Sequence, residues 1–400
     1  MLGWKEYTIG ELAIVKGGKR LPKGVNLITE RNSHPYIRIR DLTEKTIELK
    51  SSYEYVDDDT QKSISRYIVN AGDILISIVG TIGLIAVVGN TLHGANLTEN
   101  CVKLIDISDN VDREYLYYFL VSSMGQDEIR KGTVGAVQPK LPIKNIQSIK
   151  VPLPPIWIQK KISGLLSLID SKIAFNTAIN ENLEQQAQAY FVDLFITNAD
   201  PNWRIGTISD LGNVVGGGTP SKKVEEYYTS DGIAWITPKD LSNDKSKFVA
   251  HGETDITELG LTKSSATLMP KGTVLFSSRA PIGYIAIADG QICTNQGFKS
   301  IIPFDNVGTA FVYYFLKENL SAIENVASGS TFKEVSGSTM KIFTAIIPDN
   351  DTLAEFQRFC SPLFEQQRAL EYENRSLSSI RDTLLPKLMS GEIDVSAVKI

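Results

Sequence analysis

Basic side chains beside glycines are the residues of this chain best suited to a chemical task, which is to hold phosphate. The segment Ala13-Ile14-Val15-Lys16-Gly17-Gly18-Lys19-Arg20 comes nearest to a phosphate-binding loop. It has Ala13 where a nucleotide-binding P-loop has its first glycine, and Arg20 where serine or threonine would hold magnesium. It is therefore not a P-loop, but lysines, arginines and backbone N–H groups also hold the phosphates of nucleic acid.

Candidate nucleic-acid contacts recur at matching places in the two halves of the chain. Arginine and glutamine can read base edges, whereas lysine and backbone N–H groups hold phosphates. For any single residue a plain surface charge or turn is the commoner explanation, and the recurrence is what favours a function. The candidates are Lys16, Lys19, Arg20, Lys23, Arg38, Arg40, Lys131, Gln138 and Lys140 in the first half, and Thr219, Ser221, Lys222, Lys223, Lys239, Arg279 and Lys333 in the second.

The sequence contains no catalytic constellation. Gly80-Thr81-Ile82-Gly83 and Gly216-Gly217-Gly218 lack the glycine spacing of a dinucleotide-binding loop, and the Asn-Pro-Pro-aromatic motif for methylation of base amino groups does not occur. The 3 histidines and 3 cysteines show no metal-ligand spacing. We therefore expect this chain to carry no catalytic residue, cofactor or metal, and expect partners to supply any catalysis.

The net charge argues against a histone-like polyelectrolyte and is compatible with a DNA-binding protein that has local basic patches. The formal net charge is -5 over 400 residues. Counted by segment it is +1 for residues 1–151, -2 for 152–200, -1 for 201–348 and -3 for 349–400, so the acidity lies mainly outside the two repeated units. The start lacks a signal peptide and no run approaches ~20 apolar residues, which predicts a soluble cytoplasmic protein.

The elements that must position the candidate residues occur twice. Gly72-Asp73-Ile74-Leu75-Ile76-Ser77 returns 200 residues later as Gly272-Thr273-Val274-Leu275-Phe276-Ser277. Tyr117-Tyr118-Phe119-Leu120 returns 196 residues later as Tyr313-Tyr314-Phe315-Leu316. A period this long is not a solenoid repeat but a duplicated domain, which makes the chain a pseudo-dimer.

Each repeated unit has the pattern of an α+β domain. Short apolar runs between turn residues predict strands in its first two thirds, for example 36–40 and 73–77. A helical pattern then covers 113–129 in the first unit and 309–326 in the second. Shared glycines such as Gly72 and Gly272 are interpreted as turns with positive φ.

A long helix with a heptad seam follows each unit, over 158–195 and 352–385. We expect the two helices to pair as an antiparallel coiled coil with pseudo-twofold symmetry, Asn176 and Asn180 fixing its register. Pro362 is expected to kink the second helix and Pro386 to end it. Two ordinary core helices are the simpler alternative. The predicted seam residues are Ile162, Leu166, Ile169, Ile173, Leu183, Leu363, Leu370, Leu377 and Leu384.

These patterns divide the chain into four parts. We predict a first globular domain over residues 1–152, a central helix over 153–200, a second globular domain over 201–348 and a distal helix over 349–400.

The sequence resembles the specificity subunits of type I restriction-modification systems over nearly its whole length. Among the phrases that carry the resemblance are Gly216-Gly217-Gly218-Thr219-Pro220, Val151-Pro152-Leu153-Pro154-Pro155 before the first helix, and the ending Leu384-Leu385-Pro386-Lys387-Leu388-Met389. The resemblance implies two target recognition domains, each reading half of a split double-stranded DNA target, and a helix pair that sets the gap. It also implies two modification subunits that use S-adenosylmethionine, and restriction subunits that use ATP and magnesium.

Three other functions compete with this interpretation. The chain could be the recognition subunit of a related system in which methylation and cleavage share one partner polypeptide. It could instead be a scaffold whose heptad helices assemble proteins without DNA. A stand-alone nuclease or methyltransferase is disfavoured because no cofactor motif is present.

The segments Lys16–Arg20 and Val215–Thr219 differ in sequence, so we expect two different half-sites.

Overall fold

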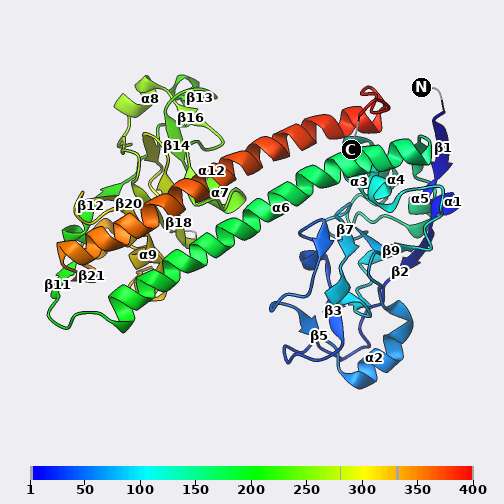
Figure 1. The fold of residues 1–400 in the computed structure, drawn as a ribbon, viewed down its shortest axis with the longest axis horizontal. Helices are drawn as coiled ribbons and strands as arrows, with labels where there is room; N and C mark the ends of the chain where they lie inside the picture. The colour runs from blue at the N-terminus through cyan, green and yellow to red at the C-terminus, as the bar shows by residue number, and fades with distance from the viewer. Residues whose placement is uncertain (1–2, 280, 330–332, 399–400) are drawn as a thin grey trace. The chain divides into compact units, whose positions relative to one another are not determined.

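Two long helices and two mixed α/β domains make up this computed structural model, which describes residues 3–279, 281–329 and 333–398. The chain divides into two units, Met1–Lys172 with Ser376–Ile400 and Ile173–Arg375. The long helices α6 (Ile156–Val192) and α12 (Asn350–Met389) each contribute to both units (Figure 1).

The first unit is built on a five-stranded sheet that is antiparallel except at one edge, where β4 and β7 are parallel. In spatial order its strands are β2 (Ile14–Gly17), β9 (Cys101–Ile105), β6 (Ile74–Ser77), β7 (Ile85–Val88) and β4 (Thr46–Ile47). The smaller sheets are β5 (Glu54–Tyr55) with β3 (Pro35–Ile37) and β8 (Asn96–Leu97), and β1 (Lys5–Thr8) with β10 (Lys150–Leu153).

The second unit repeats this topology. Its five-stranded sheet runs β12 (Gly212–Gly216), β20 (Lys299–Pro303), β17 (Val274–Ser278), β18 (Ile282–Ala288) and β15 (Phe248–Val249), again with one parallel edge pair. The two-stranded sheets are β13 (Tyr228–Thr229) with β16 (Asp255–Ile256), β14 (Ala234–Ile236) with β19 (Ile292–Thr294), and β11 (Arg204–Thr207) with β21 (Thr344–Ile347). The predicted domain duplication and α+β class are confirmed.

The helical segment that closes each domain is two helices rather than the single one predicted. In the first unit α3 (Arg113–Val121) ends at Ser122, whose hydroxyl accepts a hydrogen bond from the N–H of Gly125 and so caps α4 (Ser123–Gly132). A Cβ on Gly125 would collide with the carbonyl oxygen of Phe119, so this break requires glycine. In the second unit α9 (Thr309–Glu318) and α10 (Leu320–Asn325) replace one helix.

Short helices complete the two domains. They are α1 (Ile9–Leu12), α2 (Asp58–Ile64) and α5 (Ile143–Gln147) in the first, and α7 (Pro238–Asn243), α8 (Glu258–Thr262) and α11 (Gly337–Ile342) in the second. The glycines predicted at turns have positive φ, 87° at Gly72 and 86° at Gly272.

The helix pairing is antiparallel within each unit. In the first unit Asp170 of α6 accepts a hydrogen bond of 3.0 Å from Arg381 of α12, and the earlier Lys161 reaches the carbonyl oxygen of the later Ser396. In the second unit Asn176 contacts Asn374 at 2.9 Å, and the rings of Tyr190 and Phe356 pack at a tilt with their centroids 6.0 Å apart. Partner numbers fall along α12 as they rise along α6, which confirms the predicted antiparallel pairing in both.

Asn176 lies in the helix seam as the heptad pattern indicated. It is fully buried, and its amide donates to Glu373 at 2.8 Å. The backbone carbonyl oxygen of Asn180 accepts a hydrogen bond of 3.1 Å from the side-chain amide of Gln367. These polar contacts fit only one alignment of the two helices in this unit.

The predicted seam residues are buried to different extents. Ile162, Leu166 and Leu183 are buried, and Leu363 and Leu384 pack against the cores of their own units. The half-buried members are Ile169, Ile173, Leu370 and Leu377.

The helix-ending role predicted for Pro386 is wrong. Helix α12 continues through Pro362 and Pro386 and ends at Met389. Leu388 and Met389 are fully buried in the core of the first unit, and this packing outweighs the loss of one backbone hydrogen bond at a proline.

Among the helices of the described residues, none combines the length and hydropathy that a membrane crossing requires.

Candidate nucleic-acid interface

A glycine loop leaves the edge strand of the main sheet in each domain. In the first domain a Cβ on Gly18 would collide with the carbonyl oxygen of Thr98, so only glycine lets the loop approach the neighbouring chain this closely. The hydroxyl of Tyr36 donates to the carbonyl oxygen of Lys19 at 2.8 Å. The loop backbone is thus fixed, while the side chains of Lys19 and Arg20 remain exposed.

The second domain holds its glycine loop in the same way. A Cβ on Gly217 would collide with the carbonyl oxygen of Asn295. The indole N–H of Trp235 donates to the carbonyl oxygen of Gly218 at 2.9 Å. Trp235 stands 199 residues after Tyr36, so the anchor is repeated with a different aromatic side chain.

Two arginines of the first domain converge on one carboxylate. The carboxylate of Glu54 pairs with Arg38 and, at 2.8 Å, with Arg40. Asp41 accepts a 2.7 Å hydrogen bond from the backbone N–H of Arg38, which holds the turn that carries both arginines. Burial raises the pKa of Asp41 to about 6, against the opposing positive charges of Arg40 and Lys50.

The corresponding turn of the second domain has the same construction. Asp240 accepts a 2.7 Å hydrogen bond from the N–H of Thr237. Lys239 donates to Glu253 at 2.6 Å, and this hydrogen bond raises the pKa of Lys239. Lys239 and Glu253 each stand 199 residues after Arg40 and Glu54.

A cleft of about 500 Å³ in the second domain brings four predicted residues together. They are Thr219, Lys222, Lys239 and Arg279. Asn295 and Gln296 line the same cleft, and the hydroxyl of Thr219 hydrogen-bonds Gln296. Cations, amides and a hydroxyl in one concave surface can hydrogen-bond both phosphates and base edges.

An isolated backbone bridge joins the segment after the central strand of the main sheet to a later segment in each domain. In the first domain Lys140 bridges to Val134 and to Val79, which places this later segment beside the loop after β6. In the second domain Arg279 bridges to Glu334 in the same manner. Val79 precedes Arg279 by 200 residues, so an arginine in one domain replaces an apolar side chain in the other.

The remaining predicted contacts are exposed but less closely connected. Arg20 pairs with Glu99 at 2.7 Å, and Lys131 lies on α4 and pairs with Glu128 of the same helix. Among the described residues, no hydrogen bond or ion pair joins Lys131 to the arginine turn. The other exposed residues of this group are Lys16, Lys23, Gln138, Ser221, Lys223 and Lys333. Ser330 to Phe332, which directly precede the predicted contact Lys333, lie outside the described residues.

The carboxylates near these cations do not form a metal site. Within residues 3–279, 281–329 and 333–398, no group of three or more His, Cys, Asp or Glu side chains is arranged to hold a metal ion. Burial raises the pKa of Glu99, but the hydrogen bonds from Arg20, from Thr98 and from the backbone, together with the charge of Arg20, outweigh burial and lower the pKa. Glu54, Glu99 and Glu253 each pair with a basic side chain.

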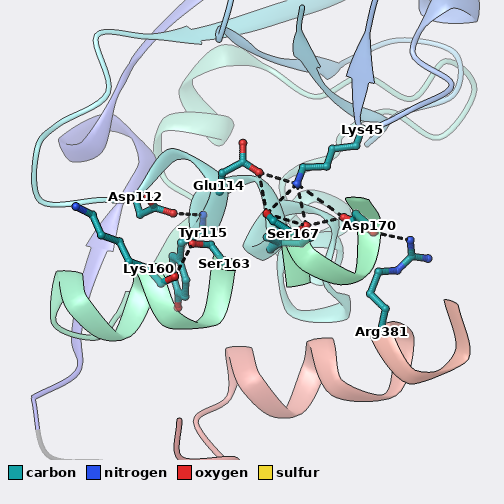
Figure 2. Close-up of polar contacts among 10 residues, drawn as sticks. Lys45, Asp112, Glu114, Tyr115, Lys160, Ser163, Ser167, Asp170 and Arg381 are labelled. Atoms are coloured by element: carbon teal, nitrogen blue, oxygen red, sulfur yellow. Dashed lines mark hydrogen bonds and ion pairs between the residues drawn. The ribbon is translucent and has the colours of Figure 1, made fainter. Parts of the chain in front are cut away.

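A lysine anchors the first domain to its own part of the long helices. Lys45, just before β4, contacts Glu114 at 2.6 Å and Ser167 of α6 at 3.2 Å (Figure 2). Figure 2 also shows Asp170 between Lys45 and Arg381 of α12. This network fixes the sheet edge that neighbours the helix within the first unit.

Lys247 takes the corresponding place in the second domain, just before β15. It is 7% exposed, and its ammonium contacts Tyr314 at 3.1 Å and Gln367 of α12 at 2.8 Å. Glu184 of α6 completes the ion pair. The anchor is thus repeated as well, with a more deeply buried lysine than Lys45.

Residues 1–185 and 201–371 match the family described as type I restriction modification DNA specificity domain. The chain belongs to this family. The predicted family membership is therefore confirmed, and the two matched segments follow the two halves of the duplication.

Two relatives of this specificity-domain family illustrate the range of similarity. The HindI specificity subunit of Haemophilus influenzae is 24% identical over 98% of this chain and 100% of its own length. The MjaIX specificity subunit of Methanocaldococcus jannaschii is 44% identical over 153 residues, which cover 38% of this chain and 35% of that protein.

A solved S subunit from M. genitalium shares the fold, with a TM-score of 0.57, 17% identity and coverage of 96% of both chains. That similarity supports the architecture of this specificity-domain chain and no finer detail.

Sequence reasoning missed the partners of the predicted cations in this specificity-domain chain. Glu54 and Glu253 are 199 residues apart, as Asp41 and Asp240 are. Their recurrence at the displacement of the repeat could have identified these carboxylates from the sequence. The anchor lysines carried a weaker signal, since each stands immediately before a short strand of the duplicated sheet.

Proposed function

We propose that this chain recognises DNA for a type I restriction-modification complex, each domain reading one half of a bipartite target. One observation carries the proposal. The two domains repeat the fixed glycine loop, the capped turn and the carboxylate-paired cation, while the side chains they present differ. The same backbone arrangement with different exposed side chains is suited to two domains that recognise two different DNA sequences.

We further propose that the helix pair sets the gap between the half-sites and docks two methyltransferase subunits. Apolar side chains lie exposed on α6 outside the seam, with Leu168 at 59% in the first unit and Phe175 at 69% in the second. Such side chains suit contact with partner proteins. The relatives HindI and MjaIX are named as specificity subunits of type I restriction enzymes, which supports the same role here.

In this proposal the chemistry belongs to the partners. Methyltransferase subunits would use S-adenosylmethionine to methylate adenine, and restriction subunits would use ATP and magnesium to cleave DNA. This chain would bind none of these cofactors.

Methylation mapping by single-molecule sequencing tests the proposal. DNA is taken from a host that expresses this chain with its neighbouring modification subunit, and from hosts that lack either one. We expect a split motif with a fixed unspecified gap, methylated only when both proteins are present. If the modification subunit methylates DNA with another specificity subunit but not with this chain, the protein scaffold becomes the better interpretation.

A further inference from the structure

Carboxylates cover the cations of both candidate surfaces. Glu54 binds Arg38 and Arg40 through one oxygen, and Glu253 binds Lys239. The carboxylate recurs after 199 residues in loops whose other side chains have changed. Its repetition indicates that the acid itself has a role in the surface.

Stability does not account for the pair of Lys239 with Glu253 or for the contact of Arg40 with Glu54, whereas the pair of Arg38 with Glu54 is more shielded from water, at 29% and 24% exposure. The side chains of Lys239 and Glu253 are 68% and 65% exposed, and that of Arg40 is 55% exposed. Ion pairs this open to water contribute little to folding. Their exposure also means that a phosphate or a base edge can reach the cation once the carboxylate moves aside.

An ion pair with a carboxylate changes how much a cation contributes to the binding of DNA. Binding to DNA of any sequence comes mainly from cations that replace counterions at phosphates, and each such contact adds about 0.9 to the slope of log affinity against log salt. A cation held by a carboxylate adds no net charge to the surface. A DNA sequence that supplies well-placed acceptors can compete with the carboxylate, whereas a mismatched one cannot.

We propose that Glu54 and Glu253 are specificity-determining positioning residues. Each glutamate holds the cations of its domain in an ion pair. The ion pair stays intact when non-specific DNA binds, and it is broken when the correct half-site binds and its acceptors replace the carboxylate. The inference rests on the proposed function, because it requires that these surfaces bind DNA.

The test compares Glu54→Gln and Glu253→Gln in the full chain bound to its methyltransferase partner. Affinity is measured against potassium chloride concentration for a duplex with the mapped target and for one that lacks it. On the duplex without the target, the salt slope should steepen by about 0.9 for Glu54→Gln and by about 0.9 for Glu253→Gln, because each substitution removes one negative charge and leaves one more cation uncompensated. The increments should add in the double variant, and the preference for the target should fall.

Glu6→Gln is the matched control. It removes the same charge from a pair with Lys150 at 2.9 Å, which lies outside the predicted contacts, and should leave both slopes unchanged. Glu253 is exposed, so Glu253→Gln should fold normally. This variant can therefore still contradict the inference if Glu54→Gln disturbs the fold.

Two results would overturn the inference alone. One is an unchanged slope on non-specific DNA in both variants. The other is loss of target binding without a gain on non-specific DNA, which would mean that the glutamates read a base, as a carboxylate can at the amino group of cytosine. If the unaltered complex shows no preference for the target, the proposed function fails, and the inference fails with it.

Discussion

At the scale of single residues, the most consequential interaction outside the candidate surfaces is the buried ion pair of Lys247 and Glu184. Lys247 is 7% exposed, and Glu184 has a second cation in Lys317 at 2.5 Å. Removing one partner of a buried pair leaves a charge without compensation. We expect Lys247→Met to lower the free energy of unfolding by roughly 3 kcal/mol, measured by chemical denaturation.

Lys317→Met provides the comparison, since its side chain is 42% exposed and contacts the same carboxylate. An exposed pair is worth about 0–1 kcal/mol, so this variant should stay within that range. Equal losses in the two variants would show that burial does not decide the strength of the pair.

The same carboxylate predicts a dependence of stability on pH. Burial opposes ionisation of Glu184, but Lys247 and Lys317 outweigh it and lower the pKa from 4.5 to about 2. A lowered pKa means that the stabilisation is fully present above pH 4.5 and is lost as the pH falls toward 2. The difference in unfolding free energy between the unaltered chain and Glu184→Gln should shrink across that window, and a constant difference would contradict the assignment.

At the scale of elements, the helix seam rests on a few buried side chains. Leu166 of α6 is fully buried in the core of the first unit, while Leu168 on the same helix is 59% exposed. We expect Leu166→Ala to destabilise the chain by about 2–5 kcal/mol in denaturant unfolding. Leu168→Ala makes the same chemical change and should cost about 0.5 kcal/mol or less. A similar cost at both positions would argue that Leu166 is not a seam residue.

These elements also show how far the sequence could predict the structure. The heptad spacing and the buried Asn176 were visible because a seam repeats along the chain, and the duplicated strands were visible because their residues recur at a fixed displacement. The helix through Pro386 was not predictable from local preference, since burial of Leu388 and Met389 decides it. Lys45 was missed because its contacts, such as Ser167, lie far away in the sequence.

At the scale of the whole molecule, the duplication separates the two reading tasks. Each candidate surface is assembled from residues of one unit, from the arginine turn and glycine loop in the first and from the cleft in the second. Corresponding positions differ in chemistry, as Val79 and Arg279 do. A change in one surface should therefore alter one half of the target only.

Arg279→Ala tests this independence. An arginine that reads a base contributes about 1–3 kcal/mol of discrimination at that base, so the variant should relax one position of one half-site in methylation mapping. Arg204→Ala removes an exposed arginine of the same unit that pairs with Asp210 outside the cleft, and should leave the motif unchanged. Relaxation in both half-sites would contradict independent reading, because Arg279 lines the cleft of the second domain alone.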